Sequence, residues 1–316
     1  MSNHLLEYIE IKDFKCFKDF KAEGFKRVNL IGGKNNVGKT AFMEACYVNT
    51  YSYKSENTIS MAISDIIMIR YNQTFFQDLF LGKGIEYVGN RIINKIKEFD
   101  SNEIYSNIQN IICSFEKEDL GVRDKKNRIK SFVGSSKISD DKLESSYGFI
   151  IENGLEDKID KIIKLVDSNI KSFRIINSEP KCNFLNNPKF INIHELGDGL
   201  LRYISIIFSL FICQKSFLFI DEIENGIHYS KLDKLWEIIL TISKEQTVQV
   251  FATTHSKECI ESYARVSKKL EEEQKIDKDD VCFIELGRND NVLESITYNY
   301  EEVISQITDH QDLRGW

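Results

Sequence analysis

The sequence lacks the features that define several large classes of protein. Its seven cysteines are widely scattered and include no Cys-x-x-Cys pair, so neither a disulfide framework nor a zinc site is expected. Aspartate and glutamate number 49 against 42 lysines and arginines, and the net charge of −7 provides no general attraction to nucleic acid or anionic membranes. DNA binding stays open as an alternative, because a local basic face can form on an acidic protein.

Segments that direct a protein into or across a membrane are also absent. The N-terminus has no positive region followed by an apolar core, which a signal peptide would have. The longest nearly apolar run, residues 203–213, includes two serines and is too short to cross a bilayer. We therefore expect a soluble, cytoplasmic protein without a membrane partner.

The most informative motif present is a glycine-rich loop at residues 33–40, which has the pattern Gly, four residues, Gly-Lys-Thr. It follows a predicted strand at 28–31 and precedes a helix that we expect to begin at Ala41. In this setting backbone N–H groups and a lysine bind the phosphates of a nucleoside triphosphate, and a threonine hydroxyl ligates Mg²⁺. The predicted phosphate-binding residues are Gly33, Lys34, Asn35, Asn36, Val37, Gly38, Lys39, Thr40 and Ala41.

The hydrophobic pattern around this loop predicts an α/β fold with a doubly wound, mostly parallel sheet. Residues 7–31 predict two or three strands with a turn at 14–17. Residues 217–220 are apolar at every position, which is typical of a central parallel strand covered on both faces. We also expect strands at 190–194, 247–252, 281–286 and 292–298, and helices at 200–213, 232–242, 256–270 and 301–307.

The middle of the chain is harder to interpret. Amphipathic patterns favour helices at 59–69, 91–99 and 155–170, and short strands are expected at 111–115 and 129–133. No heptad repeat is sustained, so a long coiled-coil arm is not expected. The predicted loops lie at 100–102, 119–127 and 134–142.

Three polar side chains follow predicted strands, where ligands of parallel sheets bind. Asp221 and Glu222 come after the strand at 217–220, and His255 comes after the strand at 247–252. We expect Asp221 and Thr40 to hold Mg²⁺ and Glu222 to polarise the attacking water as a general base. His255 is expected to hydrogen-bond to the γ-phosphate, whereas the other histidines are interpreted as structural.

The order and spacing of segments 33–40, 196–199, 217–222 and 254–256 resemble ABC-type ATPase heads, and more narrowly the SMC/RecF/OLD-like group of bacterial repair and phage defence. This resemblance implies a P-loop NTPase of ABC-head type with an antiparallel β lobe and a helical insertion. It further implies an ATPase core at 1–48 and 189–300, an inserted lobe at 49–188, and a C-terminal helix and tail at 301–316. The segment that corresponds to the ABC signature is Leu196, Gly197, Asp198 and Gly199.

The resemblance also implies how the chain assembles. In ABC heads the signature closes over the nucleotide of a second head, so a homodimer around two ATP, or a higher oligomer, is expected. Gly197 stands where transporter-type heads usually carry a serine, so backbone N–H groups would have to contact the γ-phosphate. Gln73 and Gln77 are the candidates for a Q-loop glutamine, although surface positions are favoured for both, and slow hydrolysis is compatible with this pattern.

Three outputs of the ATPase remain as alternatives. OLD-type proteins often carry a C-terminal TOPRIM nuclease, but residues after 255 show no acidic cluster with nuclease spacing, so a module without its own nuclease is expected. We favour an ATP-driven sensor or scaffold in phage defence or a nucleic-acid-linked process, which signals to a separately encoded effector such as a nuclease or toxin. The alternatives are a RecF-like DNA-binding repair ATPase and, less favoured, the nucleotide-binding subunit of a transporter.

Overall fold

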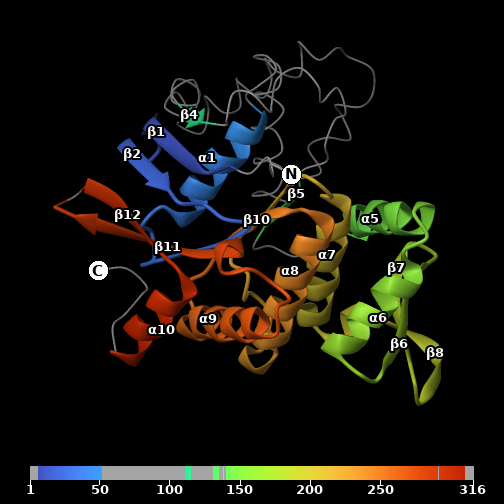
Figure 1. Ribbon diagram of the computed structural model, residues 1–316. Helices are drawn as coiled ribbons and strands as arrows, with labels where there is room; N and C mark the ends of the chain where they lie inside the picture. The colour runs from blue at the N-terminus through green and yellow to red at the C-terminus, as the bar shows by residue number, and fades with distance from the viewer. Residues whose placement is uncertain are drawn as a thin grey trace, which may run out of the picture.

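A six-stranded sheet organises the computed structural model, which describes residues 6–51, 111–114, 131–134, 138, 140–290 and 292–309. The strand order is β12-β11-β3-β10-β9-β5, and all neighbours are parallel except the antiparallel pair β11 and β12. The mostly parallel sheet predicted from the sequence is therefore confirmed (Figure 1). Its strands are β3 (Val28–Gly33), β5 (Ser131–Val133), β9 (Phe217–Ile220), β10 (Gln249–Thr253), β11 (Val281–Asn289) and β12 (Val292–Tyr298).

Both faces of this sheet are covered, as the run 217–220 predicts. Phe217 and Phe219 of β9 pack on the face that carries α1 and the β1–β2 hairpin, whereas Leu218 and Ile220 pack on the face that carries the later helices (Figure 1). A strand between two layers buries successive side chains in opposite directions, so all four positions must be apolar. The covering elements are α1 (Lys39–Tyr51), β1 (Tyr8–Phe14), β2 (Phe17–Glu23), α7 (Asp198–Ile212), α8 (Leu232–Gln246), α9 (Lys257–Glu272) and α10 (Tyr300–Thr308).

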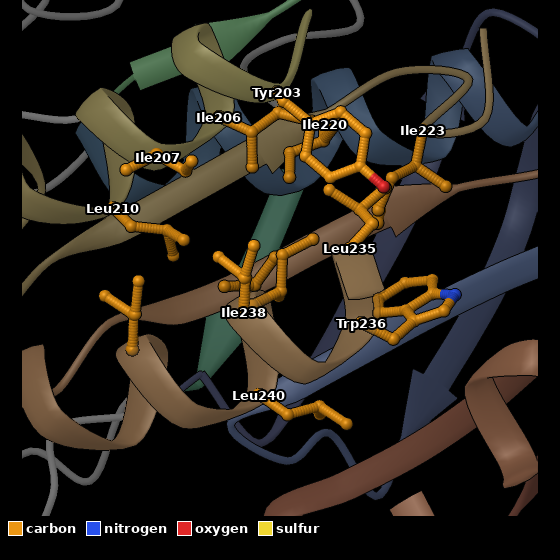
Figure 2. Close-up of a cluster of buried hydrophobic side chains, with 14 of the residues drawn as sticks. Tyr203, Ile206, Ile207, Leu210, Ile220, Ile223, Leu235, Trp236, Ile238 and Leu240 are labelled. Carbon is orange, nitrogen blue, oxygen red and sulfur yellow. The ribbon is translucent and has the colours of Figure 1, made fainter. Parts of the chain in front are cut away.

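Helix α7 forms the centre of the helical layer on the face of the sheet opposite α1. Residues 201–211 are buried without exception, which confirms the prediction that this apolar helix is enclosed nearly all round. Figure 2 shows Ile207 and Leu210 of α7 near Ile238 of α8, and Ile220 of β9 near Tyr203 of α7. Burial of each such side chain contributes about 1.5–3 kcal/mol, so this contact fixes α7 against the sheet.

Aromatic rings fill the space between the sheet and α1. The rings of Phe219 and Phe251 stack with centroids 5.4 Å apart, and Tyr47 of α1 meets Phe219 edge-on at 5.3 Å. Phe42 of α1 and Phe251 both contact Phe25 in the same edge-to-face manner. Because edge-to-face and offset pairs are orientation-dependent, this layer fixes α1 over the carboxyl half of β9 and β10.

Two smaller antiparallel sheets flank the central one. The first has the order β2-β1-β4 and includes β4 (Ile111–Ser114). The second has the order β6-β7-β8 and lies with α5 and α6 against α7 (Figure 1). Its elements are α5 (Asp140–Glu152), α6 (Glu156–Val166), β6 (Ile170–Ile176), β7 (Glu179–Phe184) and β8 (Asn187–Asn192).

Several helices and strands begin or end at residues other than those predicted from the sequence. Helix α1 begins at Lys39, two residues before the predicted start, because the backbone becomes helical directly after the glycine turn. The predicted strand at 190–194 is β8, which ends at Asn192, where the Asn192 side chain accepts from the His194 N–H at 3.0 Å and begins the short helix η1 (Ile193–Leu196). The predicted helix at 155–170 ends at Val166, and only its last predicted residue, Ile170, belongs to β6.

Other predictions are confirmed in type. The short strands expected at 111–115 and 129–133 are β4 and β5, and the apolar face expected on α6 is buried. The predicted loop at 134–142 is shorter, because α5 begins at Asp140. The helices at 59–69 and 91–99, the loops at 100–102 and 119–127, and Gln73 and Gln77 lie outside the described residues. Among the described helices, none is both long and apolar enough to span a bilayer.

Candidate functional site

The phosphate loop, residues 33–40, connects β3 to α1 through two glycines with positive φ. Gly33 has φ +147°, and a Cβ there would lie 2.6 Å from the carbonyl oxygen of Leu286 on β11. Gly38 has φ +110°, and a Cβ there would lie 2.6 Å from the Cys16 sulfur in the β1–β2 turn. Both the backbone conformation and the neighbouring atoms therefore require glycine.

Lys39 folds back over this loop. Its Nζ donates to the carbonyl oxygens of Gly33 at 2.7 Å and Lys34 at 3.0 Å. Burial lowers the pKa of the Lys39 ammonium, and the carboxylates of Glu224, Asp221 and Glu222 act in the opposite direction. The first N–H groups of α1 have no intrahelical acceptor and, with the helix dipole, make this end of the helix a site for an anion.

Asp221 follows the last residue of β9 and lies beside Thr40. The Thr40 hydroxyl is 3.3 Å from both carboxylate oxygens of Asp221, although the two residues are far apart in the sequence. The Thr253 hydroxyl, at the end of β10, donates to Asp221 Oδ1 at 2.6 Å and fixes the carboxylate. A hydroxyl and a carboxylate side by side supply the hard oxygen ligands that Mg²⁺ prefers, so the residues present suit this ion.

Glu222 occupies a tight turn directly after Asp221. Its φ of +48° lies in the left-handed region, which costs a non-glycine residue about 1–2 kcal/mol. Two interactions fix the turn: the Glu222 N–H donates to Thr253 Oγ1 at 2.8 Å, and Arg202 Nη2 donates to the Asp221 and Glu222 carbonyls at 2.6 and 3.3 Å. These hydrogen bonds therefore fix the backbone position from which the Glu222 side chain extends.

Arg202 is a buried cation on α7. Besides its bonds to the turn at 221–222, its Nη1 donates to the carbonyl oxygen of Gly134 just after β5. Burial lowers the pKa of the Arg202 guanidinium to about 10, and the carboxylates of Asp221, Glu224 and Glu222 oppose this shift. Arg202 therefore stays charged at neutral pH and connects α7 to the ends of two strands.

His255 reaches the same edge of the sheet from the end of β10. Its N–H donates to Glu224 Oε1 at 3.1 Å, and its ring Nδ1 lies 3.7 Å from the same oxygen. The imidazole is 45% exposed, whereas the Glu224 side chain is only 13% exposed. The parallel register of β3, β10 and β9 thus brings the ends that carry Lys39, Asp221 and His255 to one edge, as predicted.

The signature corner, residues 196–199, lies at the beginning of α7. Gly197 has φ +92° and precedes the first turn of the helix, and a Cβ there would meet no other atom within 4 Å. Gly199 instead packs closely, because its Cβ would lie 2.6 Å from the carbonyl oxygen of Gly226. The corner is therefore open on its outer side and joined on its inner side to the loop that follows Glu222.

Three further residues contribute to the site, and of these the resemblance to ABC heads implied only Glu224, at the start of a D-loop around Glu224–His228. Glu224 lies only three positions after Asp221, so a third carboxylate in one strand-end loop was its signal. Arg202 was marked by being a charged residue within an otherwise apolar helix. Thr253 ends an apolar strand, and a hydroxyl at that position gave a weaker signal.

Comparison with known proteins identifies the family. Residues 74–261 match the family model described as "AAA domain, putative AbiEii toxin, Type IV TA system". The chain belongs to this family. The matched range includes Asp221, Glu222 and His255 but begins after the phosphate loop, which is therefore assigned from its motif and geometry.

Relatives of this AAA-domain protein include one with a named activity. An "ATP/GTP phosphatase" from Helicobacter pylori (strain ATCC 700392 / 26695) is 24% identical over 327 residues, which cover 81% of this chain and 87% of that protein. "Uncharacterized protein MJECL10" from Methanocaldococcus jannaschii is 28% identical over 78 residues, which cover 24% of this chain and 36% of that protein.

Solved structures share the fold. An SMC head bound to the C-terminal winged-helix domain of ScpA superposes with a TM-score of 0.50 at 12% identity, over 95% of this chain and 99% of that one. The SMC head domain from Thermotoga maritima gives a TM-score of 0.46 at 13% identity, over 93% of this chain and 99% of that one. The fold is that of an α/β P-loop NTPase of the SMC and ABC head type, as predicted.

Proposed function

We propose that the protein binds ATP with Mg²⁺ and hydrolyses it to ADP and phosphate. The main observation behind this proposal is that the Thr40 hydroxyl lies 3.3 Å from both carboxylate oxygens of Asp221. This contact is directly beside a loop that requires glycine. Membership of an AAA-domain family and the relative named ATP/GTP phosphatase support it.

The phosphate loop and the first turn of α1, including the Ala41 N–H, would bind the β- and γ-phosphates. The ammonium of Lys39 would exchange the carbonyls of Gly33 and Lys34 for phosphate oxygens, which are stronger acceptors because they are charged. Bound Mg²⁺ would neutralise charge on the same oxygens, and Thr40 and Asp221 would hold it.

Glu222 would act as the general base on the attacking water, and His255 would contact the γ-phosphate. The turn at Glu222 is fixed by Thr253 and Arg202, so its carboxylate starts from a defined position. A base that is placed in advance avoids reorganisation during the reaction, and general base catalysis contributes about 10²–10⁴-fold to a rate.

The signature corner would complete the site of a second copy. Leu196, Gly197, Asp198 and Gly199 form a helix N-terminus whose outer side is open at Gly197, which suits contact with an anion from outside. We infer a homodimer that encloses two ATP, or a higher oligomer built from the same contact.

The substitution Glu222→Gln tests both hydrolysis and assembly. We expect the wild type to release phosphate with ATP and Mg²⁺, and the variant to retain ATP binding while its release falls about 10²–10⁴-fold. Analytical ultracentrifugation of the variant with ATP and Mg²⁺ should show a dimer. A monomer whose nucleotide sites are demonstrably occupied would rule out the dimer, and a wild type that releases no phosphate would rule out hydrolysis.

We propose that the ATPase acts as a sensor or scaffold in phage defence or a nucleic-acid-linked process and signals to a separate effector, such as a nuclease or toxin. The family description, which names a putative toxin of a type IV system, supports this context. The test is a pull-down from the native host with and without ATP. Recovery of a specific protein only with ATP supports the proposal, whereas recovery of DNA that salt releases favours direct DNA binding.

A further inference from the structure

Glu224 is a nearly buried carboxylate whose two oxygens have different environments. Oε1 accepts from the His255 N–H at 3.1 Å and lies 3.7 Å from ring Nδ1 of the same residue. Oε2 is buried and, within the part of the chain that the structure describes, has no hydrogen-bond partner. A buried polar atom without a partner reduces the stability of the fold by about 1–3 kcal/mol. A glutamate at this position is therefore better explained by a role in the site than by stability.

The charge of Glu224 acts on the phosphate loop as well as on His255. Burial is the main influence on the pKa of Lys39, and among the carboxylates that oppose it Glu224 comes before Asp221 and Glu222. The negative charge of Glu224 therefore acts on the lysine that would bind the phosphates, while its Oε1 contacts the histidine at the end of β10. The other side of the loop is fixed too, because the Ile223 N–H donates to the Thr253 carbonyl at 3.0 Å.

We propose that Glu224 is the positioning residue for His255: Oε1 accepts from the main-chain N–H of His255 and lies 3.7 Å from ring Nδ1, which directs the other ring nitrogen, Nε2, toward the γ-phosphate. This inference rests on the proposed function and assigns a role to a residue that neither the motif at 221–222 nor the phosphate loop includes. The ring is 45% exposed, so packing alone restricts it only in part, and in this proposal the neighbouring carboxylate determines its direction.

A double-mutant cycle tests whether Glu224 acts through His255. We expect Glu224→Gln to lower kcat by about 10–10²-fold while the ATP dissociation constant stays within about threefold, since misplacement of a reacting group affects the rate more than ground-state binding. His255→Ala should cause a loss of similar size. Adding Glu224→Gln to His255→Ala should then change kcat by less than about twofold, because the group that it positions is gone.

Glu261→Gln is the matched control. Glu261 lies on α9, and its partly exposed carboxylate pairs with Lys257 at 3.7 Å, so the same chemical change there should leave kcat unaltered. If Glu224→Gln does not fold, as judged by circular dichroism, Glu224→Asp replaces it in the cycle, because it keeps the charge but shortens the side chain by one methylene. Its kcat should also be lowered only when His255 is present.

Two results would overturn the proposal. The first is an unchanged kcat in folded Glu224→Gln, and the second is an equal loss of kcat with and without His255. An inactive wild type that binds no ATP would instead overturn the proposed function, and with it the role of Glu224. An active wild type with an unaffected Glu224 variant overturns the role of Glu224 alone.

Discussion

Two helices of the molecule begin at glycine turns, and the two turns differ in what surrounds them. The start of α1 is enclosed by Leu286, Cys16 and Asp221, and it carries its own cation, Lys39. The start of α7 is open at Gly197, where an added methyl group would meet no other atom. Both helix ends can attract an anion, but only the first has the side chains to hold one within a single chain. This difference is consistent with the proposal that α1 binds phosphates within its own chain whereas α7 contributes to the site of a second copy.

The largest effect is expected from removing the cation at the start of α1. Lys39→Ala should weaken ATP binding about 10³-fold, because two or three charge-assisted hydrogen bonds to phosphate are lost. Isothermal titration calorimetry measures the change. Lys268→Ala, an exposed lysine of α9, is the control and should bind ATP as the wild type does. Equal affinity for Lys39→Ala and the wild type would remove the distinction between the two helix starts.

The second prediction compares two glycines within the signature corner. Gly199→Ala should destabilise the fold by about 3 kcal/mol, because the new Cβ would lie 2.6 Å from a backbone oxygen of Gly226 that cannot move aside. Gly197→Ala has space for its methyl group, and its cost of about 1–3 kcal/mol should come from the backbone alone, because φ +92° with ψ 161° is a conformation that essentially only glycine adopts. Urea denaturation measures both values. If Gly199→Ala is as stable as the wild type, the close contact between Gly199 and the Gly226 carbonyl is not present.

The smallest effect concerns the support behind the proposed metal ligand. Thr253→Val should raise the Mg²⁺ concentration needed for half-maximal phosphate release about tenfold, because Asp221 loses the hydroxyl that orients it at 2.6 Å. Thr253→Ser keeps the hydroxyl and should behave like the wild type. A Mg²⁺ titration that is identical for the valine and serine variants would show that the hydroxyl has no part in metal binding.

The sequence predicts those parts of the site that depend on local pattern. The glycine loop, the all-apolar strand at 217–220 and the histidine after β10 could each be placed because glycine, hydrophobic and strand-end signals extend over a few neighbouring residues. The sheet type followed from the alternation of strands and helices between 217 and 286.

The remaining parts depend on contacts between distant segments. Arg202 reaches the carbonyls of Gly134, Asp221 and Glu222, and no short-range pattern in the sequence indicates that these backbone atoms lie together. The same holds for Gly199 and Gly226, whose closeness depends on how α7 packs beneath β9. The division into a core at 1–48 and 189–300 with an insert at 49–188 stays a prediction.

Arg202 stands one turn after the signature corner and binds the backbone at Asp221 and Glu222. In a dimer of the proposed kind, the first turn of α7 would therefore contact the nucleotide of the second copy. Its second turn, through Arg202, would bind the end of β9 beside the nucleotide of its own chain. If nucleotide binding at one site shifts the turn at 221–222, Arg202 would transmit this shift to α7 and so to the second nucleotide site. The hydrolysis rate of such a dimer would depend on ATP concentration more steeply than that of a protein with two independent sites, because the Arg202 guanidinium couples the two sites.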